Sequence, residues 1–229
     1  MKKIILFAGL IALSQVASAH TGLLPTEGFS HGFQHPFLGL DHFLVMLGLG
    51  LWASSQSRLL AKQAISLFLL FMAVGALFGL AGFGFAYVET AILVSLVLVG
   101  IALSLETSLA PTRRPSTKLM TGVGIHSARA AGCLSTQRVD TAFPRSAWER
   151  GIILMSIAIF AAMHGLAHGS EMPVAASAYT YIVGIVSGTA ILHLSGLGLG
   201  IIALRVNATG LIRVYGTMTG LVGAWLLFA

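Results

Sequence analysis

The sequence predicts an all-α polytopic membrane protein, with six transmembrane helices after a cleavable signal peptide. Hydrophobic residues make up 56% of the 229 residues and charged residues only 9%, whereas soluble domains have about 25% charged residues. The apolar residues fall into six separate runs, preceded by a shorter apolar stretch at the N-terminus. Helices are the expected form for such runs, because a helix satisfies its own backbone hydrogen bonds within a bilayer.

The N-terminal 19 residues have the pattern of a secretory signal peptide. Two lysines, Lys2 and Lys3, precede an apolar stretch over 4–13, and the small residues Ala17-Ser18-Ala19 match a signal peptidase site. An uncleaved first helix is the alternative, but the apolar stretch is shorter than the roughly 20 residues that a span needs. We therefore expect a signal peptide over 1–19 and a mature transmembrane domain over 20–229 that begins at His20.

Six spans are predicted at the apolar runs 36–52, 64–85, 86–105, 151–168, 174–195 and 211–229. Between the third and fourth spans, residues 107–150 carry seven Arg or Lys residues and three prolines without an apolar period, which predicts a flexible cytoplasmic loop. The glycine pairs Gly75/Gly79, Gly184/Gly188 and Gly216/Gly220 have the spacing that lets helices pack closely in lipid. The single cysteine excludes an internal disulfide.

The basic residues fix the expected orientation in a bacterial inner membrane. If His20 lies outside, every Lys and Arg of the mature chain falls on the cytoplasmic side, as the positive-inside rule requires. Both termini are then periplasmic. The net charge of +6 is thus explained by topology, and no nucleic-acid partner is expected.

The first of two histidine motifs occupies residues 35–42, with the sequence HPFLGLDH. Pro36 suits the first position of a helix, which makes His35 a flanking residue and places Asp41 and His42 about two turns inside. Asp41 points away from His42 on a helix and is either a direct ligand or a group that orients an imidazole. His31, four residues before His35, is a weaker addition.

The second motif occupies residues 164–171, with the sequence HGLAHGSE. On a helix His164, His168 and Glu171 lie within about 60° of one another on one face. Pro173 is expected to end this helix just after Glu171. The ligands then occupy its last turn, where exposed carbonyls and the helix dipole favour a cation.

The expected topology brings both motifs to the periplasmic membrane boundary, where ionisable groups are costly unless they have a partner or a function. Imidazole and carboxylate donors without thiolate suit nickel, cobalt, zinc or copper(II). We therefore predict one shared metal site with the ligand set His35, Asp41, His42, His164, His168 and Glu171.

Three further residues remain open at the level of sequence. A mature N-terminal His20 would offer its α-amine and imidazole as an additional chelate, although a disordered terminus is an equal alternative. His193, deep in the fifth span, is either a relay site on a pathway or a hydrogen-bonding residue between helices. Glu89 opens the third span and either attracts cations or caps that helix.

The pattern His-x5-Asp-His at 35–42 together with His-Gly-x-Ala-His-Gly-x-Glu at 164–171, in six spans after a signal peptide, resembles the HupE/UreJ family of nickel/cobalt permeases. The resemblance covers nearly all of the chain except the loop. It implies import of nickel, or sometimes cobalt, for hydrogenase or urease maturation, and it implies that the six motif residues serve transport. The loop is longer than is usual in that family, and residues 138–150 resemble a translated repetitive element inserted in frame.

The expected function is therefore that of a permease and not of an enzyme. Its expected cargo is a divalent metal ion, nickel in the first place and cobalt, zinc or copper as alternatives, and it holds no prosthetic group. An intramembrane zinc hydrolase is one alternative, but the chain has no His-Glu-x-x-His motif to place a glutamate base between two ligands. A metal-binding accessory protein is another alternative. An ATP-driven pump is not encoded, because no lysine follows a glycine and a phosphate-binding loop is therefore absent. The expected partners are the metal ion and the lipid bilayer, and the oligomeric state stays open.

Overall fold

The described part of the computed structural model, residues 27–106, 147–173 and 176–229, consists of helices joined by turns and short irregular segments and contains no strand. The helices are α2 (Glu27–Leu38), α3 (Leu40–Ala53), α4 (Arg58–Leu80), α5 (Val88–Glu106), α6 (Ala147–Ser170), α7 (Ala178–Arg205) and α8 (Thr209–Phe228). The expected signal peptide, His20 and residues 107–146 of the expected loop lie outside these residues. The last four residues of that loop, 147–150, are not loop but the first turn of α6.

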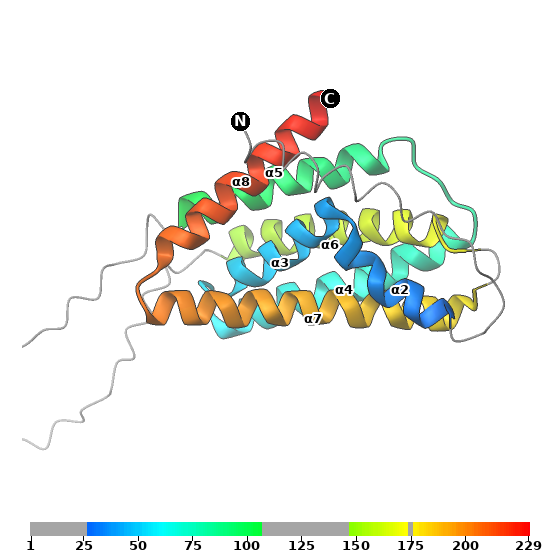
Figure 1. Ribbon diagram of the computed structural model, residues 1–229, viewed down its shortest axis with the longest axis horizontal. Helices are drawn as coiled ribbons and strands as arrows, with labels where there is room; N and C mark the ends of the chain where they lie inside the picture. Colours follow the sequence, from blue (N-terminus) through cyan, green and yellow to red (C-terminus); the bar gives the residue numbers. More distant parts are fainter. Residues whose placement is uncertain (1–26, 107–146, 174–175) are drawn as a thin grey trace, which may run out of the picture.

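Five of the described helices, α4 to α8, are long and apolar enough to cross a membrane, and α2 and α3 pass the same test only as a pair, as one broken span or a re-entrant loop. The described residues thus hold five candidate spans, or six if α2 and α3 form one span, which agrees with the six predicted. The first of them differs in shape, because α2 and α3 meet at an angle of 79°. The chain therefore contributes a bent element, not a straight helix, to the end of the bundle where α2 lies (Figure 1).

The predicted helix start at Pro36 is wrong, since Pro36 lies inside α2. Proline has no N–H to offer the preceding turn, so it weakens a helix that continues past it. The helix ends two residues later, and Gly39 takes an extended conformation with φ −79° and ψ 118°. A hydrogen bond from the Phe43 N–H to the Gly39 carbonyl, 2.8 Å long, then begins α3. His35 is therefore a helical residue on one side of the joint and His42 a helical residue on the other.

The bundle consists of three helix pairs, α4 with α6, α5 with α8, and the bent α2–α3 element with α7 (Figure 1). Glycines make each close approach possible: a Cβ on Gly75 would collide with the Ala162 carbonyl, and one on Gly184 with the Phe29 carbonyl. A Cβ on Gly216 would press on the Leu103 side chain. The predicted role of these glycines in packing is therefore confirmed, as expected for helices that associate in lipid through backbone contact.

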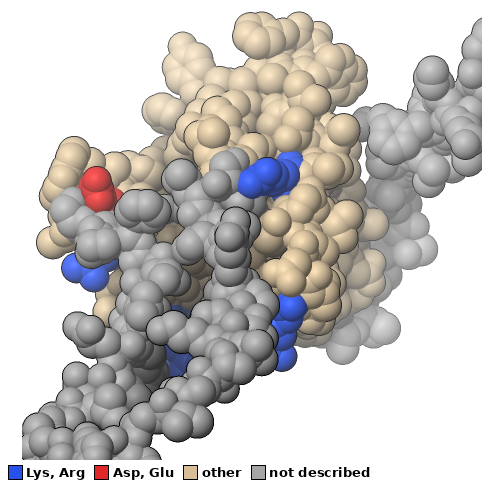
Figure 2. Space-filling view, turned by 90° about the vertical axis from the view of Figure 1, so that its left-hand side faces the viewer, with Lys and Arg blue, Asp and Glu red and all other residues tan. Residues whose placement is uncertain are grey.

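The described basic residues all belong to one end of the bundle. This end holds the start of α4, the start of α6, the end of α7 and the start of α8, with the basic side chains Arg58, Lys62, Arg150, Arg205 and Arg213. Figure 2 shows this end, and Lys and Arg side chains gather on it. The histidine motifs lie near the start of α3 and the end of α6, and so at the opposite end.

Candidate metal centre

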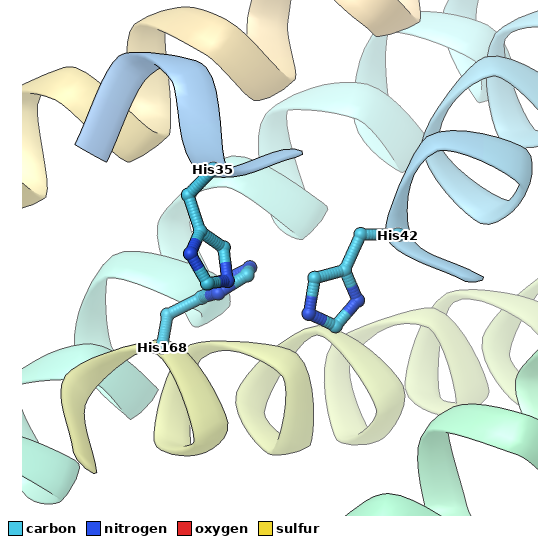
Figure 3. Close-up of side chains that lie close together, drawn as sticks. All are labelled: His35, His42 and His168. Atoms are coloured by element: carbon cyan, nitrogen blue, oxygen red, sulfur yellow. The ribbon is translucent and has the colours of Figure 1, made fainter. Parts of the chain in front are cut away.

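Three histidines from three helices converge at the end of the bundle opposite to the basic residues. His35 comes from α2, His42 from α3 and His168 from α6, and the nitrogen atoms that they offer lie within 4.8 Å of one another (Figure 3). Nitrogen ligands bind first-row divalent ions at about 2.1 Å, so two of them on one ion are at most about 4.2 Å apart. Three nitrogens spaced by up to 4.8 Å lie at most about 2.8 Å from a common centre, so each would have to move inward by up to about 0.7 Å to bind one ion.

The ring of His168 lies at the centre of this group. Its centroid is 4.5 Å from that of His42 and 4.7 Å from that of His35, both in edge-to-face contact. The side chain is fully buried, and neither of its nitrogens has a hydrogen-bond partner among the described residues. A buried polar atom without a partner costs about 1–3 kcal/mol, a cost that a bound cation would remove.

Asp41 lies beside His42, with its Oδ2 atom 3.5 Å from the Nδ1 atom of that histidine. The contact is close enough for an ion pair but is not a hydrogen bond, so the buried Nδ1 atom has no hydrogen-bond partner within the described part of the chain. Of the two roles that the sequence left open for Asp41, this position favours orientation of the imidazole. Carboxylates next to ligating histidines commonly fix the ring in this way.

Glu171 follows the end of α6 and contacts His35 across the entrance of the site. The His35 Nε2 atom lies 3.2 Å from the Glu171 Oε2 atom, and both side chains are partly open to the surroundings, with 32% and 47% exposed. The hydrogen bond from His35 lowers the pKa of Glu171 below its ordinary value. The carboxylate therefore keeps its negative charge at the mouth of the site, where it would attract a cation.

His164 lies one turn deeper on α6. Its ring centroid is 5.5 Å from that of His42, and its side chain is fully buried. Its Nδ1 atom is 2.9 Å from the Phe160 carbonyl, while its Nε2 atom has no partner among the described residues. His164 therefore adjoins the three-histidine group without belonging to it. His31 is exposed on α2, outside the group.

Glu89 stands at the start of α5, on the same end of the bundle. It lines an open recess of about 210 Å³ together with Phe85 of the preceding turn and Leu166 and Ser170 of α6. The sequence analysis left two roles open for Glu89, attraction of cations and capping of the helix. The recess places its carboxylate beside α6, near the second motif.

Phe68 of α4 is a residue that the sequence analysis did not single out. Its ring contacts both His164, at a centroid distance of 5.8 Å, and His193, at 4.8 Å. An apolar residue inside an apolar run gives no signal of its own in a single sequence. The helix α2 was also missed, although Gly28 and Gly32 have the same four-residue spacing as the packing glycines and lie against α7.

Comparisons with known proteins place the chain in a family. A profile of the family described as HupE / UreJ protein matches residues 8–130 and 141–226. The chain is 32% identical over 219 residues to Protein HupE of Rhizobium leguminosarum bv. viciae, which covers 95% of this chain and 93% of that protein. No solved structure matches the chain. By the extent of the profile match and of this alignment, the chain belongs to the HupE/UreJ family.

Proposed function

We propose that this protein is a secondary permease of the bacterial inner membrane that imports nickel, or cobalt, for the maturation of hydrogenase or urease. Membership of the HupE/UreJ family supports an accessory role in nickel or cobalt transport. In this proposal residues 1–19 are removed as a signal peptide, and the histidine end of the bundle faces the periplasm. Its basic end faces the cytoplasm, as the positive-inside rule favours.

The observation that supports the proposal most directly is the meeting of the two motifs. His35 and His42 of the first motif and His168 of the second offer their nitrogens within 4.8 Å of one another. The donors are imidazoles without thiolates, a set that suits nickel, cobalt, zinc and copper(II) and does not select among them by affinity alone. The family narrows the proposed cargo to nickel or cobalt.

The exposure of these groups decreases along the proposed route. Glu171 and His35 are partly exposed, His42 is 6% exposed, and His168 and His164 are fully buried. A hydrated cation would first meet the carboxylate, and imidazole nitrogens would then replace its water ligands as it moves inward. Each step exchanges water for a protein donor, so the ion is not left without ligands in an apolar interior.

The membrane potential supplies a driving force for this direction of transport. A divalent cation that crosses a potential of 100 mV gains about 4.6 kcal/mol, twice the 2.3 kcal/mol per elementary charge. Uptake therefore requires no nucleotide hydrolysis. A metal-binding accessory protein would have the same outer group of ligands, but metal would not cross the membrane.

Flux measurements separate these functions. The full-length protein in proteoliposomes with a negative interior should take up radioactive nickel, in competition with cobalt. His168→Ala should abolish uptake, whereas Ser156→Ala, a substitution of a partly exposed residue on the same helix, should preserve it. Binding of nickel without flux would replace the permease with an accessory function. The absence of both would overturn the proposal.

A further inference from the structure

A second histidine site lies deeper in the bundle than the group at the entrance. His193 is fully buried at the middle of α7. It lies about 22 Å along the axis from the start of that helix, at 1.5 Å per residue. Within a hydrocarbon core of about 30 Å, such a position is far from either surface. Ionisable side chains at this depth are rare unless they have a partner or a function.

One nitrogen of His193 has a partner that determines its protonation. The Nδ1 atom lies 2.7 Å from the main-chain carbonyl of Met46 on α3. A carbonyl only accepts hydrogen bonds, so Nδ1 carries the proton and donates it. In the neutral ring, Nε2 then holds a free lone pair. This Nε2 atom is buried and has no hydrogen-bond partner among the described residues.

His164 has the same arrangement. Its Nδ1 atom donates to the Phe160 carbonyl, and its buried Nε2 atom also lacks a partner within the described part of the chain. Histidines that bind metals commonly donate their second ring nitrogen to a carbonyl, which fixes the tautomer and the orientation of the ring. Both rings contact the side chain of Phe68. Two imidazoles with free Nε2 atoms therefore flank one aromatic ring in the interior.

We propose that His193 is an inner ligand that receives the metal ion from the entrance group, by way of His164, during its passage across the membrane. This inference rests on the proposed transport function. It adds a ligand that belongs to neither histidine motif and stands on a helix, α7, that contributes nothing to the entrance group. The cargo is a borderline divalent cation, since the free donor is an imidazole nitrogen.

A purely structural role for His193 would rest on its hydrogen bond to Met46 alone. That bond links α7 to α3, but the two helices already touch through their backbones, because a Cβ on Gly50 would collide with the His193 carbonyl. The structural role also leaves the unpartnered Nε2 atom without an explanation. The two roles depend on different atoms of the ring, so substitutions that keep one atom and remove the other distinguish them.

The test uses two replacements of His193 in the full-length protein in proteoliposomes. Asparagine places an amide N–H near the position of Nδ1 and keeps the bond to Met46, but it has no group at Nε2. Glutamine places a donor oxygen or nitrogen near Nε2 and loses that bond. We expect His193→Asn to reduce radioactive nickel flux about tenfold or more, and His193→Gln to retain more flux than His193→Asn.

Equilibrium nickel binding at the entrance group should change by no more than about twofold in both variants, as expected for separate sites. Ser95→Ala on α5 is the matched control, because Ser95 is also a buried side chain bonded to a main-chain carbonyl, that of Ile92; its flux should be that of the unmodified protein.

Three results would overturn the inference: wild-type flux in His193→Asn, a reversed order with glutamine below asparagine, or a flux loss in Ser95→Ala equal to that in His193→Asn. In each case the unmodified protein still transports, so the proposed function survives. If the unmodified protein moves no metal, both the function and the inner ligand fail. If only one His193 variant inserts into the membrane, its flux relative to the unmodified protein decides.

Discussion

The imidazole rings of His42 and His168 lie edge to face with their centroids 4.5 Å apart, although they belong to helices α3 and α6 at distant points of the chain. The two rings join the first motif to the second within the buried end of the bundle. Their contact brings into one region four nitrogens, on His42, His164 and His168, that have no hydrogen-bond partner among the described residues. Metal binding by this region is open to the following tests.

Asp41→Asn should weaken nickel binding about ten- to a hundredfold, the usual effect of losing a carboxylate that orients a ligating histidine. The substitution keeps the size of the side chain but removes the charge beside the His42 Nδ1 atom. Isothermal titration of the purified protein measures the affinity. His31→Ala, an exposed histidine on α2, is the control and should bind nickel normally. Equal affinities in Asp41→Asn and the control would show that Asp41 does not serve the site.

Glu171→Gln should weaken nickel binding about two- to fivefold, since partly exposed charge pairs contribute up to about 1 kcal/mol. The hydrogen bond from His35 lowers the pKa of Glu171 below its ordinary value of 4.5. The carboxylate is therefore ionised above that value, and its contribution is lost only as the pH falls through the lowered pKa. The ratio of the nickel affinity of the unmodified protein to that of Glu171→Gln should stay constant between about pH 5.5 and 8. A ratio that falls to one within this range would mean that the pKa is raised instead.

Gly165→Ala should destabilise the protein by about 1–3 kcal/mol, as expected for overpacking, and should reduce metal uptake. A Cβ at this position would collide with the Met72 carbonyl and push α4 away from the segment of α6 that carries His164 and His168. Gly151→Ala on the same helix is the matched control, because no atom of the described residues lies within 4 Å of where its Cβ would be. Thermal unfolding in detergent and nickel flux are the two measurements. Equal stability of both variants would contradict close packing of α4 on α6.

Deletion of residues 131–140 should leave uptake unchanged. This segment lies within the polar region predicted from the sequence to be a loop, and the family profile matches the chain on either side of it. A shortened protein that reaches the membrane at normal levels and takes up no nickel would show that the segment is required. Radioactive nickel accumulation per unit of membrane protein is the appropriate comparison.

Hydropathy predicted where the candidate spans lie, because an apolar run of sufficient length reflects the lipid around a helix, whichever helices it packs against. Spacing predicted that His164 and His168 share a helix, since residues four apart lie on one face. The location of the bend was not predictable in this way. Proline favours the first turn of a helix, but here the packing of Gly28 and Gly32 against α7 extends the helix through Pro36.

The partners of each histidine depend on packing between helices and could not be derived from one sequence. The sequence placed His35, His42, His164, His168, Asp41 and Glu171 in one set without ranking them. The structure separates His35, His42 and His168, which form the close group, from His164, which lies deeper. The hydrogen bond from His193 to the Met46 carbonyl joins residues on different helices, and no spacing rule within one helix could indicate it.

The 79° bend at Gly39 places His35 on one arm of a joint and His42 on the other. A cation bound by both residues would connect the two helices across the bend. A change in the angle between α2 and α3 would therefore be coupled to the release of the ion. By thermodynamic linkage, an ion that binds only the bent form stabilises it by about 2.7 kcal/mol at a hundred times its dissociation constant. The angle between α2 and α3 would then report the occupancy of the centre, and a motion of α2 along α7 would be enough to empty it.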